Sequence, residues 1–479
     1  MGKLKRNFSD MLVYKSPEQG KFFSSLSLPS FIRDWLVMKF ADENGVIDKN
    51  EVDLYIKRVI PKKEQWESIK YNLTRNMQSV RFLAKVKIDI DIATSTAYFS
   101  LPDFGVPKSK NEAIVEWDVV EKNKEYLLSP NEVWGIVELI CEPLKPGYSE
   151  KNVIKMTEFT PFCPYSIDLE YYVEARKDFA IEEWIDILLA AIDYNPAGYS
   201  NETQKLTMLS RLLPFVEKRV NLIELAPKGT GKSYLFSQIS KYGWLVSGGS
   251  ISRAKMFYDM NKKTTGLVAH YDYVAFDEIQ SIAFPDKNEM QGALKGYLES
   301  GEFRVGDYRG VGESGLILLG NIADEIMNVN LNMFVDLPPF FHEDTALLDR
   351  FHGFIKGWDI PRMKESLKVN GWALNVEYFS EIMHLLRNEL IYRAIVDDVL
   401  DVPKNADTRD TEAIKRICTG FMKLLLPHVR MVDELDLNEF NKYCLMPAMK
   451  MREIIKTQLG IMDTEFRGKN IPEIRIKNI

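Results

Sequence analysis

The stretch "LAPKGTGKSY", residues 225–234, constrains the fold of this 479-residue chain more than any other feature. It follows the apolar segment "NLIEL" and precedes the helical pattern "KSYLFSQIS", so a strand, a glycine-rich turn and a helix are expected in succession. A turn of this kind points backbone N–H groups and a helix N-terminus at a phosphate. The pattern G-x-x-x-x-G-K-[ST] is matched except at its first position, where Ala226 replaces glycine.

We interpret the stretch as a phosphate-binding loop, because the methyl group of Ala226 is the smallest departure from glycine. The remaining glycines let the backbone approach a phosphate closely, while the lysine supplies charge and the hydroxyl supplies a ligand for Mg²⁺. ATP and Mg²⁺ are therefore the predicted cofactors. A chance turn rich in glycine and lysine is the alternative, which the flanking strand and helix disfavour. The predicted nucleotide-binding residues are Lys228, Gly229, Thr230, Gly231, Lys232 and Ser233.

A pair of carboxylates ends a second apolar strand, "YVAFDEIQ", residues 273–280. In a phosphate-loop ATPase one such carboxylate holds Mg²⁺ and its neighbour polarises the attacking water. We therefore predict that Asp277 holds Mg²⁺ together with Ser233 and that Glu278 is the general base. Alone, such a pair is usually a solvated strand end, but about forty residues after a phosphate loop it is a strong signal.

Two further polar residues lie where ATP hydrolysis would use them. Asn321 ends the apolar segment "GLILLGNI" and is predicted to orient the attacking water, with a turn-forming asparagine as the alternative. Arg350, in "ALLDRFHGFI", is predicted to stabilise the charge of phosphoryl transfer across a subunit boundary, with a surface ion pair as the alternative. If Arg350 acts on a neighbour's nucleotide, a single chain cannot complete the site and a closed ring is expected.

The texture of the sequence changes along the chain. Between Val80 and Phe162, short β-rich runs such as "EAIVEWDVV" (residues 112–120) are separated by Pro, Gly and Asn turns, which favours a small antiparallel sheet or barrel, here predicted to be OB-like. The predicted fold class is an α/β phosphate-loop NTPase core, preceded by an α + β N-terminal domain and followed by a helical C-terminal region. The predicted segments are 1–79 (helical), 80–178 (β-rich), 179–360 (α/β ATPase core) and 361–479 (helical lid and C-terminal region).

Composition narrows the class of protein. The net charge is −7, so any contact with nucleic acid must come from a local basic surface. The four cysteines are far apart in sequence, which favours reduced, buried thiols over a disulfide framework or a zinc site. No apolar run approaches the roughly 18 residues that a membrane span needs. We therefore expect a cytoplasmic protein without a membrane partner.

Two local segments are candidates for binding DNA. "EFRVGDYRGVGESGLILL", residues 302–319, is predicted to form a strand, a glycine-rich turn and a strand, and carries Arg304 and Arg309, although nearby acidic residues offset their charge. "SRAKMFYDMNKKTTG", residues 252–266, combines basic and aromatic residues, as in segments that follow a nucleic-acid backbone. An ordinary surface hairpin and a solvated helix end are the alternatives. The candidates in the second segment are Arg253, Lys262 and Lys263.

The order of these motifs resembles that of AAA+ ATPases, in the clade of the minichromosome maintenance helicases and Lon. The blocks "KYGWLVSGG", "MQGALKGYLESGEFRVGDYRG" and "ADTRDTEAIKRI" are similar to those of the Lon-like family of the BREX phage-defence system, the BrxL family, up to about Ile471. The resemblance implies that Asn321 is sensor 1, that Arg350 is the arginine finger and that Arg409 belongs to sensor 2. It also implies that Arg304 and Arg309 lie on a hairpin that enters the pore of a ring.

The resemblance further implies what the chain acts on. A homo-oligomeric ring of six or seven subunits, single or stacked, would hold DNA, with duplex DNA favoured, and would act with other BREX proteins. A protein unfoldase of Lon type and a nucleotide-gated scaffold stay open as alternatives. Many relatives continue into a protease domain with a Ser–Lys dyad, whereas this sequence stops at Ile479. We therefore expect no peptide hydrolysis, whether the chain is naturally short or a truncated form.

Overall fold

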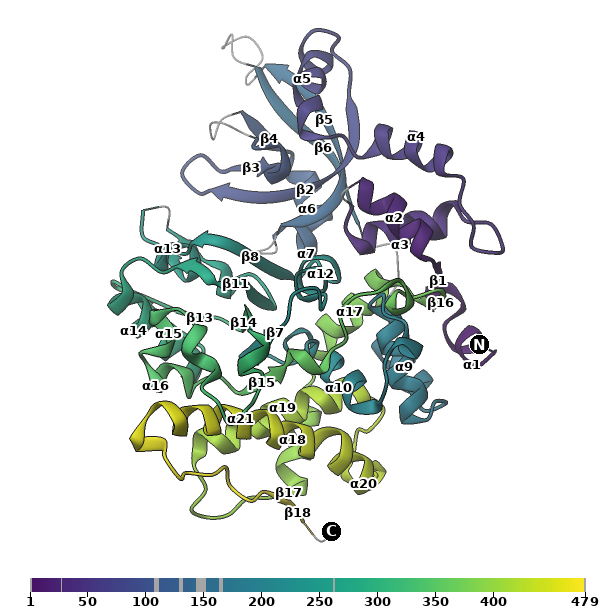
Figure 1. Ribbon diagram of the computed structural model, residues 1–479. Coiled ribbons are helices and arrows are strands. Elements are labelled where there is room, and N and C mark those ends of the chain that lie inside the picture. The colour runs from purple at the N-terminus through teal and green to yellow at the C-terminus, as the bar shows by residue number, and fades with distance from the viewer. Residues whose placement is uncertain are drawn as a thin grey trace. The chain divides into compact units, whose positions relative to one another are not determined.

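The chain, seen in a computed structural model, divides into two compact units (Figure 1). The structure describes residues 2–26, 28–106, 112–128, 132–143, 152–162, 167–261 and 263–477. Phe40–Ser166 form what we call the barrel unit, whereas Met1–Lys39 and Ile167–Ile479 together form the sheet unit. The division into segments 1–79, 80–178, 179–360 and 361–479 was predicted from changes in the residue pattern along the sequence, and it stays a prediction.

A parallel sheet lies at the centre of the sheet unit. Its strands run in the order β15-β7-β14-β11-β8, and every neighbouring pair is parallel. All carboxyl ends therefore lie along one edge of the sheet, which is where α/β folds bind their ligands. The predicted α/β core with a parallel sheet is confirmed. The strands are β7 (Leu222–Ala226), β8 (Gly243–Ser250), β11 (Tyr273–Ala283), β14 (Gly315–Asn321) and β15 (Gly353–Lys356).

Apolar side chains cover both faces of this sheet. Every residue of β7 is buried, as are Leu316–Gly320 of β14, because helices pack on both sides of a parallel sheet. The core also includes Val274 and Phe276 of β11. The helices between the strands are α12 (Lys232–Gln238), α13 (Arg253–Met256), α14 (Lys287–Ser300), α15 (Pro339–His342) and α16 (Thr345–Leu348).

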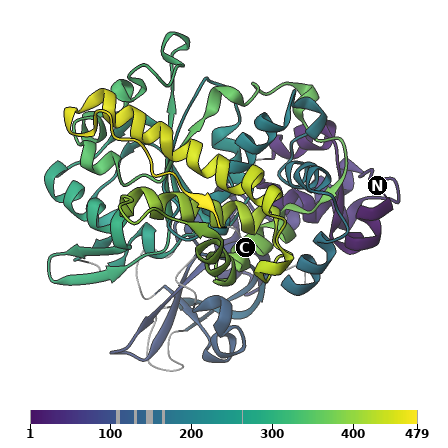
Figure 2. The same cartoon turned by 90° about the horizontal axis from the view of Figure 1, so that it is seen from below.

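The C-terminal helices lie together on one side of the sheet unit (Figures 1 and 2). A Cβ built on Gly353 of β15 would lie 2.8 Å from Ile417 Cδ1 and 3.0 Å from Met451 Cβ, so two of these helices pack directly on the edge strand. Two short strands, β17 (Leu400–Asp401) and β18 (Arg475–Ile476), pair beside them. The helices are α18 (Ile391–Val399), α19 (Thr408–Leu425), α20 (Leu437–Phe440) and α21 (Met446–Met462), whereas α17 (Val376–Leu386) precedes them and lies apart from them in Figure 1.

The segment before the barrel unit also belongs to the sheet unit. Strand β1 (Leu12–Lys15) pairs antiparallel with β16 (Gly371–Leu374). Two buried ion pairs add to this contact, because Asp193 accepts from both Lys15 Nζ and Arg33 Nη2 at 2.8 Å. The remaining helices of this segment are α1 (Gly2–Phe8), α2 (Pro17–Ser25) and α3 (Ser30–Phe40).

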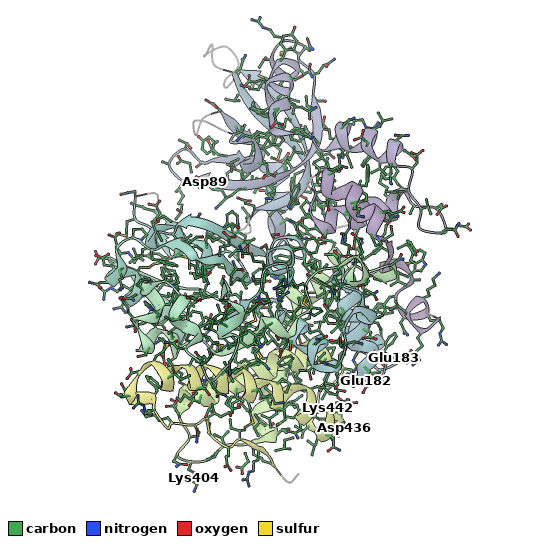
Figure 3. All side chains as sticks on the ribbon, in the orientation of Figure 1. Asp89, Glu182, Glu183, Lys404, Asp436 and Lys442 are labelled. Atoms are coloured by element: carbon green, nitrogen blue, oxygen red, sulfur yellow. The ribbon has the colours of Figure 1, made fainter. Side chains whose placement is uncertain are left out.

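The short helices that come between β6 and β7 in the sequence pack against the C-terminal helices. The indole of Trp184 donates to the carbonyl of Leu424 at 3.0 Å. Near the labelled side chains of Figure 3, the Tyr443 hydroxyl donates to Glu182 at 3.1 Å, and Lys442 pairs with Glu202 at 2.9 Å. The helices are α8 (Leu169–Arg176), α9 (Ile181–Ala191), α10 (Glu202–Ser210) and α11 (Leu213–Val216).

The barrel unit is a closed barrel in the strand order β2-β3-β4-β6-β5. Strands β4 and β6 are parallel, whereas the other neighbours are antiparallel. Its apolar interior includes Phe82, Phe99, Val137, Leu139 and Met156. The elements are α4 (Lys49–Val59), α5 (Trp66–Thr74), β2 (Val80–Asp91), β3 (Thr96–Ser100), β4 (Ala113–Val115), α6 (Trp117–Lys122), α7 (Lys124–Leu127), β5 (Val133–Pro143) and β6 (Asn152–Pro161).

One predicted strand is wrong over half of its length. Residues 112–120 were expected to form a single strand, but β4 ends at Val115 and α6 begins at Trp117. The adjacent residues Val119 and Val120 are both buried against the barrel core, which a helix permits and a strand with one buried face does not.

Two predictions drawn from composition concern the described residues. In the part of the chain that the structure describes, no helix is long and apolar enough to cross a membrane. Cys141, Cys418 and Cys444 are buried free thiols, as expected, and Cys163 lies outside the described residues.

A substitution at Gly135 of β5 can test how tightly the barrel is packed. A Cβ on Gly135 would lie 2.2 Å from the ring of Phe159 and 2.8 Å from the carbonyl of Thr160. We expect Gly135→Ala to destabilise the barrel unit by about 1–3 kcal/mol through overpacking. Native-state hydrogen exchange should show faster exchange at Val137 and Leu139 and unchanged exchange in β7. The exposed control Glu142→Ala, on the same strand, should change neither, and equal protection in both variants would contradict the prediction.

Candidate nucleotide-binding and hydrolysis site

The phosphate-binding loop follows β7 at the carboxyl edge of the sheet. Gly229 and Gly231 have φ angles of 84° and 78°, in the left-handed region that favours glycine, and Gly231 directly precedes α12. Lys232 Nζ lies 3.4 Å from the carbonyl O of Ala226 and 3.4 Å from Asn321 Oδ1. The lysine therefore points from the loop toward the end of the neighbouring strand β14, where a terminal phosphate would lie.

The alanine at the first loop position is accommodated by a glycine that directly follows another strand. Ala226 is fully buried, and a Cβ on Gly357, just beyond β15, would lie 2.2 Å from the Cβ of Ala226 and 2.8 Å from the carbonyl O of Leu225. The space that the methyl group of Ala226 requires is thus supplied by the missing side chain of Gly357. The loop keeps its course because the N–H of Met363 donates to the carbonyl of Gly229 at 2.7 Å.

Ser233 and Asp277, the two predicted metal ligands, meet at this edge. The hydroxyl of Ser233 donates to Asp277 Oδ2 at 2.5 Å, although the two residues come from different elements. Hydroxyl and carboxylate oxygens are ligands that Mg²⁺ prefers, and Mg²⁺ completes its shell with phosphate and water. Among the described residues no cluster of three or more His, Cys, Asp or Glu side chains could hold a metal, so the pair fits a nucleotide-bound Mg²⁺ rather than an all-protein metal cage.

Glu278 has an unusual backbone conformation. Its φ angle is +50°, which a non-glycine residue adopts only at a cost and which is frequent at functional sites. Its N–H donates to Asp277 Oδ1 at 3.0 Å, and its own side chain is exposed. The backbone turn therefore holds Asp277 against the sheet and directs Glu278 into solvent at the same edge, where water is available to it.

Gln280 joins the two strand ends, and the sequence analysis missed it. Its amide Nε2 donates to the carbonyl of Asn321 at 2.8 Å, and its Oε1 accepts from the N–H of Asn321 at 3.4 Å. These two bonds fix the end of β14 against β11. The only sequence signal was a polar residue three positions after Asp277, which is too weak to identify the contact.

A fully buried ion pair supports the loop from below, and it too was missed. Arg211 Nε donates to Glu224 Oε2 at 2.9 Å, and its Nη1 donates to the carbonyl of Thr230 in the loop at 2.8 Å. Both charged side chains are fully buried. Burial lowers the pKa of Lys232, whereas the negative charge of Glu224 opposes that shift. Removing one partner would leave an uncompensated buried charge directly under the loop.

The two predicted catalytic arginines lie together, but at the opposite edge of the sheet. Arg350 Nε and Arg409 Nη2 contact the same carboxylate oxygen of Glu299, at 2.9 and 3.0 Å. Arg350 precedes β15, whose first residue pairs with the first residue of β7. At roughly 3.3 Å per residue, the length of β7 separates this edge from the phosphate loop by about 15 Å. Arg350 is therefore too far from the loop of its own chain to contact a phosphate there.

These arginines border a small, strongly basic cavity of about 130 Å³. Burial, followed by the charge of Arg416, lowers the pKa of His352 well below its usual value. His352 is neutral, since its Nδ1 accepts from the N–H of Asn221 at 2.9 Å. Four arginines outnumber two carboxylates in its lining, which consists of Arg219, Leu298, Glu299, Arg350, His352, Thr408, Arg409, Glu412 and Arg416.

Arg304 and Arg309 lie on one hairpin, and Arg253 lies in α13, shortly before a second hairpin. Arg304 of β12 (Glu302–Val305) pairs with Arg309 of β13 (Tyr308–Val311), and both side chains are exposed. The second hairpin joins β9 (Tyr258–Asp259) to β10 (Thr264–Thr265). The rings of Tyr258 and Tyr308 stack with centroids 3.6 Å apart and an interplanar angle of 4°. The two hairpins therefore contact each other through these stacked rings.

The basic residues of the second hairpin region differ in their surroundings. Arg253 pairs with Glu289 at 2.5 Å, so part of its charge is already neutralised. Lys263 is exposed and has a positive φ of 53°. Lys262 lies outside the described residues.

Comparison with known proteins gives matches over most of the chain. Residues 154–472 match the family "Lon-like protease BrxL-like, ATPase domain", and residues 6–140 match "BREX system Lon protease-like protein BrxL N-terminal". The Lon-like protease BrxL of Escherichia coli O9:H4 (strain HS) is 29% identical over 463 residues, which are 95% of this chain and 64% of that protein. The Lon-like protease BrxL of Bacillus cereus (strain H3081.97) is 34% identical over 335 residues, 69% of this chain and 48% of that protein. The chain thus spans less than two thirds of the length of these curated relatives.

The pairing of Ala226 with Gly357 gives a direct test of the loop. We expect Gly357→Ala to lower the free energy of unfolding by about 1–3 kcal/mol and to weaken ATP binding, because the new methyl group pushes the start of the loop. Ala226→Gly, the matched control, removes a methyl group from the same contact and should keep ATP binding. Thermal unfolding and calorimetric titration with ATP measure both quantities. Unchanged stability and ATP affinity in Gly357→Ala would show that the loop does not depend on this contact.

Proposed function

Because the chain belongs to the BrxL family of the BREX defence system, we propose that it is an ATP-hydrolysing AAA+ motor that assembles into a ring and binds DNA. The observation that carries the proposal is that the predicted phosphate-binding, metal-binding and water-orienting side chains lie together at one edge of the sheet. Lys232 lies 3.4 Å from Asn321, and Ser233 lies 2.5 Å from Asp277. Charge for the phosphates, oxygen ligands for Mg²⁺ and a polar strand end are thereby brought to one place, as phosphoryl transfer to water requires.

Each residue at this edge has a role that follows from its chemistry. Residues 228–231 direct backbone N–H groups at the phosphates, and Lys232 neutralises the terminal phosphate. Ser233 and Asp277 hold Mg²⁺, which when bound neutralises charge on the phosphates. Glu278 accepts a proton from the attacking water, and the Asn321 amide orients that water. Gln280 holds Asn321 in place.

The arginines complete the site from a second subunit. Arg350 and Arg409 line a basic cavity at the edge opposite to the phosphate loop, and a cavity of this charge attracts an anion. In a ring of identical subunits with head-to-tail contacts, this edge of one subunit meets the phosphate edge of the next. The terminal phosphate of the neighbour is the anion that we assign to it. The ring is a hexamer or heptamer, single or stacked, by resemblance to related AAA+ proteins.

DNA is the proposed substrate of the motor. Arg304 and Arg309 are exposed at facing positions of one hairpin, and among the described residues neither is paired with a carboxylate, so both are available to phosphates. The closed five-stranded barrel supports the predicted OB-like fold, a class that binds oligonucleotides. We assign DNA binding to the hairpins and the barrel. Other BREX proteins are the proposed partners of the ring.

An unfoldase is the competing function, and one contact counts against it. Unfoldase pores grip a polypeptide with exposed aromatic side chains, and Tyr308 is the aromatic residue at the tip of the hairpin. Its ring is half-buried and stacked on Tyr258. One face of Tyr308 is therefore already occupied within the subunit, whereas the neighbouring arginines face solvent.

Mixed rings test the role of Arg350. We expect Arg350→Ala and Lys232→Ala each to lower kcat by roughly 10³-fold or more, because each removes one half of the site. When the two variants are mixed in equal amounts, roughly a quarter of the interfaces in a randomly assembled ring pair an intact loop with an intact arginine. ATP hydrolysis should therefore reappear on mixing. A mixture that stays as inactive as its components would mean that Arg350 does not act across a subunit boundary.

DNA binding tests the substrate. We expect Glu278→Gln to bind ATP without hydrolysing it and to bind duplex DNA with an affinity that falls steeply as salt rises. In that background, Arg304→Ala and Arg309→Ala should each reduce the slope of log affinity against log salt by about one. Arg467→Ala, an exposed arginine elsewhere, is the matched control and should not change the slope. Absence of DNA binding at low salt, with ATP hydrolysis stimulated by unfolded protein and lost in Tyr308→Ala, would establish the unfoldase instead.

A further inference from the structure

One buried side chain holds the backbone of Arg350 from both sides. Arg452 of α21 is fully buried, and its Nη1 donates to the carbonyl of Asp349 at 2.9 Å and to that of Phe351 at 2.7 Å. These carbonyls belong to the residues immediately before and after Arg350. The position from which the Arg350 side chain extends is therefore set by a single guanidinium on the C-terminal helix.

The same guanidinium also holds the helix that carries Arg409. Arg452 Nη2 donates to Asp349 Oδ1 and Nε donates to Asp410 Oδ1, each at 2.7 Å. Asp410 is fully buried and follows Arg409 in the first turn of α19. A guanidinium has five N–H donors in a planar fork, so one group serves two backbone carbonyls and two carboxylates. Lysine, a point charge with rotatable donors, cannot reproduce this geometry.

The contacts continue outward as a chain of alternating charge that ends at Arg350. Asp349 Oδ2 accepts from Arg409 Nη1 at 2.6 Å, and Glu299 contacts both Arg409 and Arg350. Side-chain exposure rises from 0% for Arg452 to 33% for Arg409 and 47% for Glu299, and falls to 19% for Arg350. The members in order are Lys456, Asp410, Arg452, Asp349, Arg409, Glu299 and Arg350.

We propose that Arg452 is a positioning residue for ATP hydrolysis, which aims Arg350 and Arg409 at the nucleotide of the neighbouring subunit. The buried inner end of the chain gives both arginines a rigid base, while Glu299, which is half-exposed, can release their guanidinium groups when a phosphate arrives. Arg452 touches neither substrate nor cofactor and acts through the two arginines. The proposal rests on the proposed function, in which Arg350 and Arg409 act across a subunit boundary.

The test is Arg452→Lys in the full chain, which keeps the positive charge beside Asp349 and Asp410 but loses the planar fork. We expect kcat for ATP hydrolysis to fall at least tenfold while KM for ATP stays within twofold, because the variant's own phosphate loop is unchanged. Mixing it with Lys232→Ala subunits should restore activity, since those subunits carry an intact Arg452. Arg467→Lys, the same chemical change at an exposed position, is the control and should leave both constants unchanged.

Several outcomes would overturn the proposal. These are a wild-type kcat in Arg452→Lys, a raised KM with unchanged kcat, or lost activity that mixing does not restore although mixing restores Arg350→Ala. If Arg452→Lys does not fold, Asp349→Asn replaces it, since the amide keeps an acceptor for Arg452 and loses the charge that holds Arg409. A wild-type kcat in Asp349→Asn likewise overturns the proposal. A wild-type kcat in Arg350→Ala refutes the proposed function itself, which separates the two failures.

Discussion

The parallel direction of one set of strands determines where all the chemistry of this chain lies. Because β7, β14 and β11 run the same way, their ends deliver the phosphate loop, Asn321 and Asp277 to one edge of the sheet. The same constraint puts the residues before β15, including Arg350, at the other edge. The predicted loop and metal ligands are thus held apart from the predicted catalytic arginines within one chain, which is the arrangement that the proposed ring requires.

Local patterns predicted the parts of the site that are local. The strand, glycine turn and helix around residues 225–234 lie where they were expected, and so does the apolar strand that ends at Asn321. The strand expected to end at Asp277 instead continues as β11 to Ala283. Such segments carry their own signal, because periodicity and glycine placement depend on neighbours in sequence. The sequence alone also indicated that Ala226 is tolerable, but not why. The reason lies in Gly357, which is adjacent only after β15 has aligned with β7.

The rest of the site depends on contacts between distant segments. Gln280, Glu224 and Arg452 are unremarkable polar residues in sequence, yet each acquires its role from a partner on another element. The predicted strand at residues 112–120 failed for a related reason. Apolar residues at Val119 and Val120 suit a strand and a helix equally well, and packing against the barrel core decided in favour of α6. Periodicity cannot separate such cases when the segment is short.

The pairing of β1 with β16 has a consequence for the order in which the chain folds. Leu12 lies opposite Leu374, so β1 lacks its partner strand until the residues between them have been made. Residues 40–166 form a unit of their own and come between them, and domains generally fold as units during synthesis. The barrel therefore folds first, and the N-terminal strand closes the sheet unit late. Until then Leu12 and Val13, which are buried in the folded chain, lack the strand that covers them.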